Sequence, residues 1–274
     1  MMGSRIEDNN LIIEPTTLTN QQTFKNLLTV DIGDPRRYRQ AHIPQAINIY
    51  PQQLLSGLMP AAGKLPPLTQ LESLFSHIGY RDKDQHIVVY DDEGGGWAGR
   101  FIWTLDVIGH THYSYLNGGL NAWAEAGLSL EKGQNTPEPT QVSLSINNDV
   151  RASREYIEAN LNNPDIVIWD ARSPAEYRGE KVFSQRGGHI PGAINYEWTR
   201  AIDPTKSYRI REGIQQELNA LGITKDKEII THCQSHHRSG FTYLVAKTLG
   251  YRHVKAYDGS WSEWGNLPDT PVEV

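Results

Sequence analysis

The chain has 274 residues, which is long enough for one large or two ordinary domains, each able to bury its own core. Its apolar fraction of 38% and charged fraction of 21% are those of a folded globular protein, and the net charge of -6 argues against a partner that is nucleic acid or an anionic membrane surface. A single cysteine excludes an intramolecular disulfide framework. No apolar run is long enough to span a bilayer, and the polar residues 1–10 do not resemble a signal peptide, so we expect a cytoplasmic location.

Hydrophobic periodicity predicts alternating strands and helices in the first half of the chain. The expected elements, in chain order, are a short strand at 11–13, a helix at 19–28, a strand at 28–32, a Pro- and Gly-rich loop at 51–67, a helix at 68–78, a strand at 86–90, a helix ending near 108, a strand at 114–116 and a helix after 118–119. Parallel strands joined by helices are the expected arrangement.

An internal repeat extends this reading to the second half. Three segments of the second half match three of the first: 168–177 with 30–38, 189–195 with 42–48, and 250–264 with 109–123. We therefore expect an α/β fold made by tandem duplication, in which each copy is a parallel sheet flanked by helices. The predicted domains are 15–130 and 147–274, joined by a polar linker at 131–146.

The only cysteine lies between a predicted strand and a predicted helix. Ile229 and Ile230 begin a buried strand, and an apolar face with helical spacing follows from Phe241. Backbone N–H groups of such a loop and the positive end of the following helix stabilise an anion, so we expect Cys233 to be a thiolate nucleophile. Arg238 adds a positive charge suited to an oxyanion.

The spacing of this loop indicates the size of the group it handles. Cys233 and Arg238 form a Cys-x4-Arg pattern, one residue shorter than the Cys-x5-Arg loop of cysteine-dependent phosphatases. A shorter ring fits one extra sulfur atom on the cysteine better than a tetrahedral phosphate. A phosphatase or an arsenate reductase is the enzymatic alternative.

Other side chains are candidates for substrate binding. Within the loop they are Gln234, Ser235, His236 and His237; outside it they are Arg186, in an insert (178–188) that the first copy lacks, and Trp198 as a pocket wall. Some of these residues can also be explained without any contact with a substrate. The histidines can be solvated loop residues, and Arg178 and Arg186 can be surface charges. A metal site at Cys233, His236 and His237 is disfavoured, because a structural zinc site needs four ligands and a tight loop cannot aim three at one ion.

The first copy differs from the second at the reactive position. Its strand at 86–90 runs into Asp91 where the second copy has Cys233, and the glycine-rich turn that follows carries no arginine. A carboxylate cannot accept a sulfur atom as a thiolate does. We expect the first copy to be catalytically silent and to pack against the second.

These residues resemble the rhodanese family, and specifically its two-domain thiosulfate sulfurtransferases. Tyr38-x3-His42-Ile43-Pro44-Gln45-Ala46 is similar to the amino-terminal signature, with Gln45 in place of the usual glycine, and residues 254–264 fit the carboxy-terminal signature throughout. The resemblance covers about residues 15–272. The loop beginning at Cys233 looks like the variant of some bacterial members and departs from the type found in 3-mercaptopyruvate sulfurtransferases.

The resemblance implies transfer of sulfane sulfur from thiosulfate to cyanide or a thiol through a persulfide on Cys233, with no cofactor. It also implies that the persulfide could feed a sulfur-accepting protein. Two alternatives stay open here. One is a 3-mercaptopyruvate sulfurtransferase, and the other is a non-catalytic interaction module, as many rhodanese-like domains are.

Overall fold

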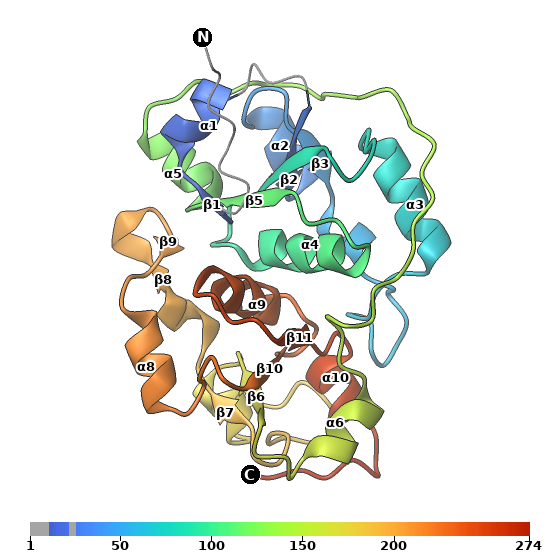
Figure 1. Ribbon diagram of the computed structural model, residues 1–274, viewed down its shortest axis with the longest axis vertical. Helices are drawn as coiled ribbons and strands as arrows, with labels where there is room; N and C mark the ends of the chain where they lie inside the picture. The colour runs from blue at the N-terminus through green and yellow to red at the C-terminus, as the bar shows by residue number, and fades with distance from the viewer. Residues whose placement is uncertain (1–10, 22–25) are drawn as a thin grey trace.

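A five-stranded parallel sheet organises the first half of the chain (Figure 1). In this computed structural model, which describes residues 11–21 and 26–274, its strands run in the order β1-β5-β4-β2-β3. The elements are β1 (Ile12–Ile13), α1 (Pro15–Gln21), β2 (Leu27–Ile32), α2 (Pro35–Gln40), β3 (Ile47–Ile49), the 3-10 helix η1 (Pro51–Leu54), α3 (Leu68–His77), β4 (His86–Tyr90), α4 (Gly96–Val107), β5 (Tyr113–Leu116) and α5 (Gly119–Glu125). The central strand β4 is an almost continuous apolar run because both of its faces are covered.

A four-stranded parallel sheet organises the second half, in the order β11-β10-β6-β7. The elements are α6 (Arg154–Asn160), β6 (Ile166–Asp170), α7 (Pro174–Tyr177), β7 (Ile194–Asn195), η2 (Trp198–Ala201), β8 (Ile202–Asp203), η3 (Pro204–Lys206), β9 (Arg209–Ile210), α8 (Ile214–Ala220), β10 (Glu228–His232), α9 (Arg238–Thr248), β11 (Val254–Ala256) and α10 (Ser260–Trp264). Strands β8 and β9 form a separate antiparallel pair.

The two sheets share one strand order, since β5-β4-β2-β3 in the first corresponds to β11-β10-β6-β7 in the second. A stacked Tyr–His pair recurs at the same place in each: Tyr38 with His42 at 3.9 Å between ring centroids, and Tyr177 with His189 at 3.6 Å. Each tyrosine hydroxyl donates to the backbone carbonyl four residues after its histidine, at 2.6 and 2.7 Å. The predicted tandem α/β architecture is confirmed, and these histidines belong to its scaffold.

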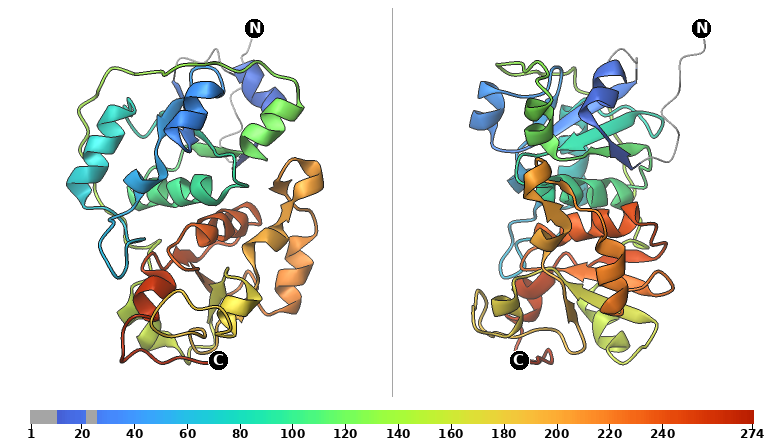
Figure 2. Two further views of the ribbon diagram at one scale, coloured as in Figure 1. Left: turned by 180° about the vertical axis from the view of Figure 1, so that it is seen from behind. Right: turned by 90° about the vertical axis from the view of Figure 1, so that its left-hand side faces the viewer.

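Helices α4 and α9 form the closest contact between the halves, and they lie against each other at the middle of the molecule in each view (Figures 1 and 2). Glycines make this approach possible. A Cβ added at Gly99 would lie 2.3 Å from the carbonyl oxygen of Gly240, and one added at Gly240 would lie 2.6 Å from the backbone nitrogen of Arg100. Because those atoms are backbone, neither helix can yield to a side chain there.

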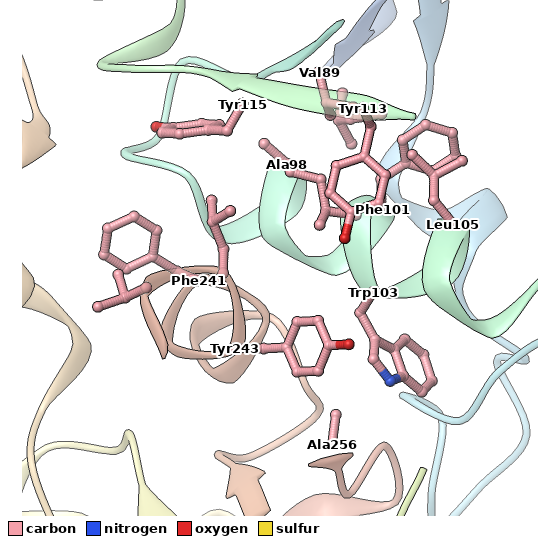
Figure 3. Close-up of a cluster of buried hydrophobic side chains, with 14 of the residues drawn as sticks. Val89, Ala98, Phe101, Trp103, Leu105, Tyr113, Tyr115, Phe241, Tyr243 and Ala256 are labelled. Atoms are coloured by element: carbon pink, nitrogen blue, oxygen red, sulfur yellow. The ribbon is translucent and has the colours of Figure 1, made fainter. Parts of the chain in front are cut away.

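One apolar cluster extends across this contact (Figure 3). Phe101 and Trp103 of α4 and Phe241 and Tyr243 of α9 are all buried within it. At the same contact, Asp106 of α4 accepts hydrogen bonds from the hydroxyls of Tyr113 at 2.8 Å and Tyr243 at 2.6 Å. The halves are therefore joined by a shared core as well as by the linker.

Two expectations for the first half need correction. The helix predicted at 19–28 is wrong: α1 begins at Pro15, strand β2 has already started at Leu27, and residues 22–25 lie outside the described part of the chain. Proline at the first helical position explains the earlier start, because its fixed φ suits that position. The loop predicted at 51–67 contains the short helix η1.

The segment between the halves runs along α3. The backbone N–H of Thr140 donates to the carbonyl of Ser76 at 3.2 Å, and the amide of Leu144 donates to Glu72 at 3.1 Å. The connection is thus held against the first half. Over the described residues, no helix combines the length and the apolar character needed to cross a bilayer.

Candidate active site

Cys233 directly follows the carboxyl end of β10 and precedes α9, as the strand–loop–helix pattern predicts. Strand β10 pairs with β6 over its whole length, which places His232 beside Asp170. The carboxyl ends of parallel strands are where sheets of this kind bind ligands. The thiol is 1% exposed, so its chemistry depends on the groups that the protein places around it.

The loop supplies hydrogen-bond donors to Cys233 and is itself held by α10. The carbonyl oxygens of Cys233 and Gln234 accept from the amides of Trp261 and Ser262 at 3.0 and 2.9 Å. The amides of Ser235 and Ser239 and the hydroxyl of Ser239 hydrogen bond to Cys233. The sulfur therefore lies among polar donors at the amino-terminal end of α9, where an anion is favoured.

These contacts set the protonation state of the thiol. Burial raises the pKa of Cys233, but the charge of Arg238 and the hydrogen bonds from Ser239 and Ser235 lower it by more. The net pKa of Cys233 lies below the ordinary value. Ionised cysteine is the nucleophilic form, so the loop favours attack by the sulfur.

Arg238 is fixed by a buried carboxylate. Its Nη1 and Nη2 donate to Oε2 and Oε1 of Glu176 at 2.6 and 2.8 Å, and that carboxylate also accepts from the hydroxyl of Ser173 at 2.8 Å. The sequence pattern Ser-Pro-x-Glu explains this position, since Ser173 and Glu176 form the capping box of α7. Arg238 acts on the sulfur through its charge while its two Nη atoms are held by Glu176.

The side chain of His236 turns into the contact between the halves. Its ring packs edge-on against Trp103 of α4 at 4.6 Å, and Nδ1 lies 2.7 Å from the hydroxyl oxygen of Ser239. Its φ of +58° is left-handed, and Gly94, at the same loop position of the first half, has φ +94°. Packing against Trp103 stabilises a conformation that a non-glycine residue otherwise avoids. Burial lowers the pKa of His236 well below the ordinary value, so the ring is neutral at pH 7.

His237 also packs against the first half. Its ring lies 4.4 Å from that of Trp97 and 5.6 Å from that of Trp198, and Nε2 lies 3.6 Å from a carboxylate oxygen of Glu93. Burial lowers the pKa of His237 to about 4. Trp198 is therefore a wall beside the loop, in contact with His237 and Phe241.

Gln234 and Ser235 contact segments on opposite sides of the loop. Nε2 of Gln234 donates to the hydroxyl of Ser184 in the insert at 3.1 Å. The backbone of Ser235 meets Gly63 of the first half, where an added Cβ would lie 2.4 Å from the Ser235 carbonyl oxygen. The loop is thus enclosed by the insert on one side and the segment before α3 on the other.

The basic residues of the insert have partners of their own. Arg186 donates to the carbonyl oxygens of Thr270 at 2.7 Å and Trp264 at 2.9 Å, and also reaches Leu267, which ties the insert to the carboxy-terminal segment. Arg178 is exposed and pairs with Glu180 at 2.7 Å. The guanidinium of Arg186 is thus engaged by backbone carbonyls of the carboxy-terminal segment, and that of Arg178 by Glu180.

The corresponding loop of the first half holds its own anion. Asp91 accepts from the backbone amides of Glu93, Gly95 and Ala98 at 3.1, 2.8 and 3.0 Å. Its carbonyl accepts from the amide of Leu120 at 2.9 Å, as the carbonyl of Cys233 accepts from Trp261 in the second half. The carboxylate of Asp91 therefore uses the amides of its own loop. The matching loop of the second half carries the thiol of Cys233 at this position.

Several groups around Cys233 were not singled out from the sequence. They are Ser239, Glu176, Ser260, whose hydroxyl lies 3.4 Å from the Cys233 amide, and Arg100 of α4. A signal for Arg100 exists in the sequence. Helix α4 is apolar on all sides, and a charge within a fully buried helix must itself be buried. Glu176 is visible as the last residue of a capping box, but its partner in the active loop is not.

Comparison with known proteins gives one consistent result. The rhodanese-like domain matches residues 14–126 and again 153–267. A thiosulfate sulfurtransferase of Azotobacter vinelandii is 54% identical over 264 residues, covering 96% of this chain and 97% of that protein. A thiosulfate sulfurtransferase of Pseudomonas aeruginosa is 52% identical over 271 residues, covering 99% and 100%. The crystal structure of YnjE is similar in fold, with a TM-score of 0.87 and 22% identity, over 96% of this chain and 68% of that one. The chain described here belongs to the rhodanese family.

Proposed function

We propose that this chain is a thiosulfate sulfurtransferase in which Cys233 carries the transferred sulfur. The thiolate attacks the outer sulfur of thiosulfate, a new S–S bond forms on Cys233, and the S–S bond of thiosulfate breaks with its electron pair leaving on sulfite. Cyanide or a thiolate then attacks the terminal sulfur of the persulfide, and the Cys233 thiolate is released. This is covalent catalysis in two half-reactions.

The observation that carries the proposal is the position of Cys233 just before α9, where Arg238, Ser235 and Ser239 lower the pKa of the thiol in spite of its burial. The amides of Ser235 and Ser239 that favour the thiolate also lie where the added sulfur of a persulfide would need donors. The names of the two bacterial relatives above, each more than half identical to this chain, agree with it.

The sulfonate end of thiosulfate needs donors and a positive charge. Arg238 supplies charge beside the loop, while Gln234 and Ser235 offer polar groups next to Cys233. His236 and His237 have a structural role in this proposal and do not bind the substrate. Both are neutral and packed against the first half, so we assign them to holding the loop in shape. The donor and acceptor are small molecules, and a sulfur-accepting protein and a cytoplasmic location stay predictions.

Steady-state rates with two donors test the proposal. Thiosulfate and 3-mercaptopyruvate are compared side by side with cyanide as acceptor, and p-nitrophenyl phosphate serves as a phosphatase control. We expect thiosulfate to be the better donor, initial rates that follow a ping-pong pattern, and no phosphate release. Faster turnover of 3-mercaptopyruvate would mean that this compound, and not thiosulfate, is the preferred sulfur donor. Phosphate release would contradict sulfur transfer as the reaction of this loop.

A further inference from the structure

Arg100 is a fully buried arginine of α4 that forms no ion pair with any carboxylate of the described residues. Three other partly or fully buried arginines differ: Arg37 pairs with Asp31, Arg172 with Asp170 and Arg238 with Glu176. A buried charge without a counter-charge is costly, so such a group usually has a partner or a task.

The guanidinium of Arg100 is held by backbone oxygens. Nη1 donates to the carbonyl of Gly63 at 2.8 Å and Nη2 to the carbonyl of Leu54 at 2.7 Å. Nε is buried without a hydrogen-bond partner, and Cζ lies 4.8 Å from the ring centroid of Trp103. Carbonyls and an aromatic face hold the cation in place but leave its charge uncompensated.

Two of these neighbours, Gly63 and Trp103, contact the active loop of the other half. Gly63 packs against the backbone of Ser235, and Trp103 packs against His236. The backbone of Arg100 itself lies against Gly240 of α9. A residue of the half without the cysteine therefore reaches the active loop through Gly63 and Trp103 and also contacts α9 directly.

The charged and titratable groups around the sulfur come from several elements; they are Arg238 with Glu176, His232 with Asp170, His236, Asp258 and Arg100. Glu176 is the ion-pair partner of Arg238 at 2.6 Å, and Arg151 is the ion-pair partner of Asp258 at 3.6 Å. His232 is neutral at pH 7, because burial lowers its pKa to about 4. Burial lowers the pKa of Arg100 to about 10, opposed by the charges of Asp258 and of ionised Cys233, so Arg100 keeps its proton at pH 7.

We propose that Arg100 is a positioning residue supplied by the half without the cysteine: it holds the active loop through Gly63 and Trp103, and its uncompensated charge stabilises the anion on Cys233. The inference deepens the proposed function and rests on it only for the identity of the sulfur donor. It gives the half whose own loop is filled by Asp91 a part in the reaction.

The test uses the rate of Cys233 alkylation by iodoacetamide as a function of pH in the full-length chain. Arg100→Met should raise the midpoint of this profile by about one pH unit, since loss of a nearby opposite charge raises a thiol pKa. Lys247→Met is the matched control. It removes a cation from the same α4–α9 contact, about 14 Å along α9 from Arg238 at 1.5 Å per residue, and should leave the midpoint unchanged.

A folded Arg100→Met protein with the native midpoint would overturn the proposal. If that variant does not fold, Arg100→Lys decides the question. It is compared with Arg100→Gln, which keeps a polar side chain but carries no charge: the lysine variant should keep a midpoint near the native one and the glutamine variant should have a raised midpoint, and equal midpoints in the two variants would overturn the proposal. Alkylation needs no sulfur donor, so the result is independent of whether thiosulfate is the substrate.

Discussion

Arg238, the first residue of α9, donates through both Nη atoms to the buried carboxylate of Glu176, at 2.6 and 2.8 Å. This pair joins the helix that follows the active loop to the helix that follows β6. It fixes the direction from which the charge of Arg238 acts on Cys233. The charge of Arg238 is the strongest of the influences that lower the pKa of Cys233, and Glu176 holds it in place.

Replacing Glu176 with Gln should destabilise the protein by about 2 kcal/mol, because hydrogen bonds to charged groups contribute on the order of 1.5–3 kcal/mol each. Burial raises the pKa of Glu176, but Arg238 and Ser173 lower it by more, so the net pKa is below the ordinary value. The stability from this pair is therefore present above the unfolded-state pKa of about 4.3 and is lost as pH falls through the folded-state pKa. Urea unfolding of both proteins at pH 7 and in acid measures this, and an unchanged difference across that range would contradict it.

Introducing a cysteine into the first loop should not create a second active site. In the double variant Asp91→Cys/Cys233→Ala, the new thiol follows β4 as Cys233 follows β10, but Gly96 stands where Arg238 stands in the second half. An arginine cannot be accommodated there without movement, because a Cβ at Gly96 would lie 2.3 Å from Nε2 of His237. Thiosulfate treatment followed by a mass spectrum should show no added sulfur. A persulfide on this variant would contradict the prediction that the loop of the first half cannot support sulfur transfer.

The repeated elements of the fold were predictable because they are local and occur twice. The segments around Tyr38 and Tyr177 each carry their own capping, stacking and turn residues, so each copy supports the reading of the other. Helix α1 precedes β2 as α6 precedes β6, but the sequence repeat begins only after these two helices. Without that support the sequence predicts a helix that starts at Thr19, whereas Pro15 begins the helix four residues earlier.

The active loop was predictable only as far as its contacts are local. The strand before Cys233, the helix after it and the direction of the charges follow from adjacent residues. The orientations of His236 and His237 are determined by Trp103 and Trp97, more than 130 residues earlier in the chain. The partners of Arg186 and the location of Arg100 depend in the same way on contacts between distant segments, which no periodicity or spacing encodes.

Removing the hydroxyl of Ser239 should raise the pKa of Cys233. Ser239 contributes both its hydroxyl and its amide to the sulfur, and Ser239→Ala leaves only the amide. Fewer hydrogen bonds to the charged form weaken the preference for the thiolate. Alkylation at pH 7 should slow, and its pH midpoint should rise. Ser262→Ala is the control, because that hydroxyl donates to the carbonyl of Gly259 in α10; equal profiles for the two variants would refute the role of Ser239.

The glycine contact between α4 and α9 should be intolerant of even one methyl group. Gly99→Ala places a Cβ 2.3 Å from a backbone oxygen of α9, and overpacking of this kind costs about 1–3 kcal/mol. We expect a melting temperature lower by several degrees and slower sulfur transfer, since the loop depends on this contact for its shape. Gly57→Ala is the comparison: its Cβ would meet no atom within 4 Å, although its φ of +70° adds local strain. A larger loss in Gly57→Ala than in Gly99→Ala would contradict the account of the helix contact.

The most direct test of the central claim is the mass of the intact protein before and after incubation with thiosulfate, without an acceptor. The account predicts that the native chain gains one sulfur atom, that cyanide removes it, and that folded Cys233→Ala gains none. An unchanged native mass, or an added sulfur that survives in Cys233→Ala, would contradict the assignment of Cys233 as the carrier.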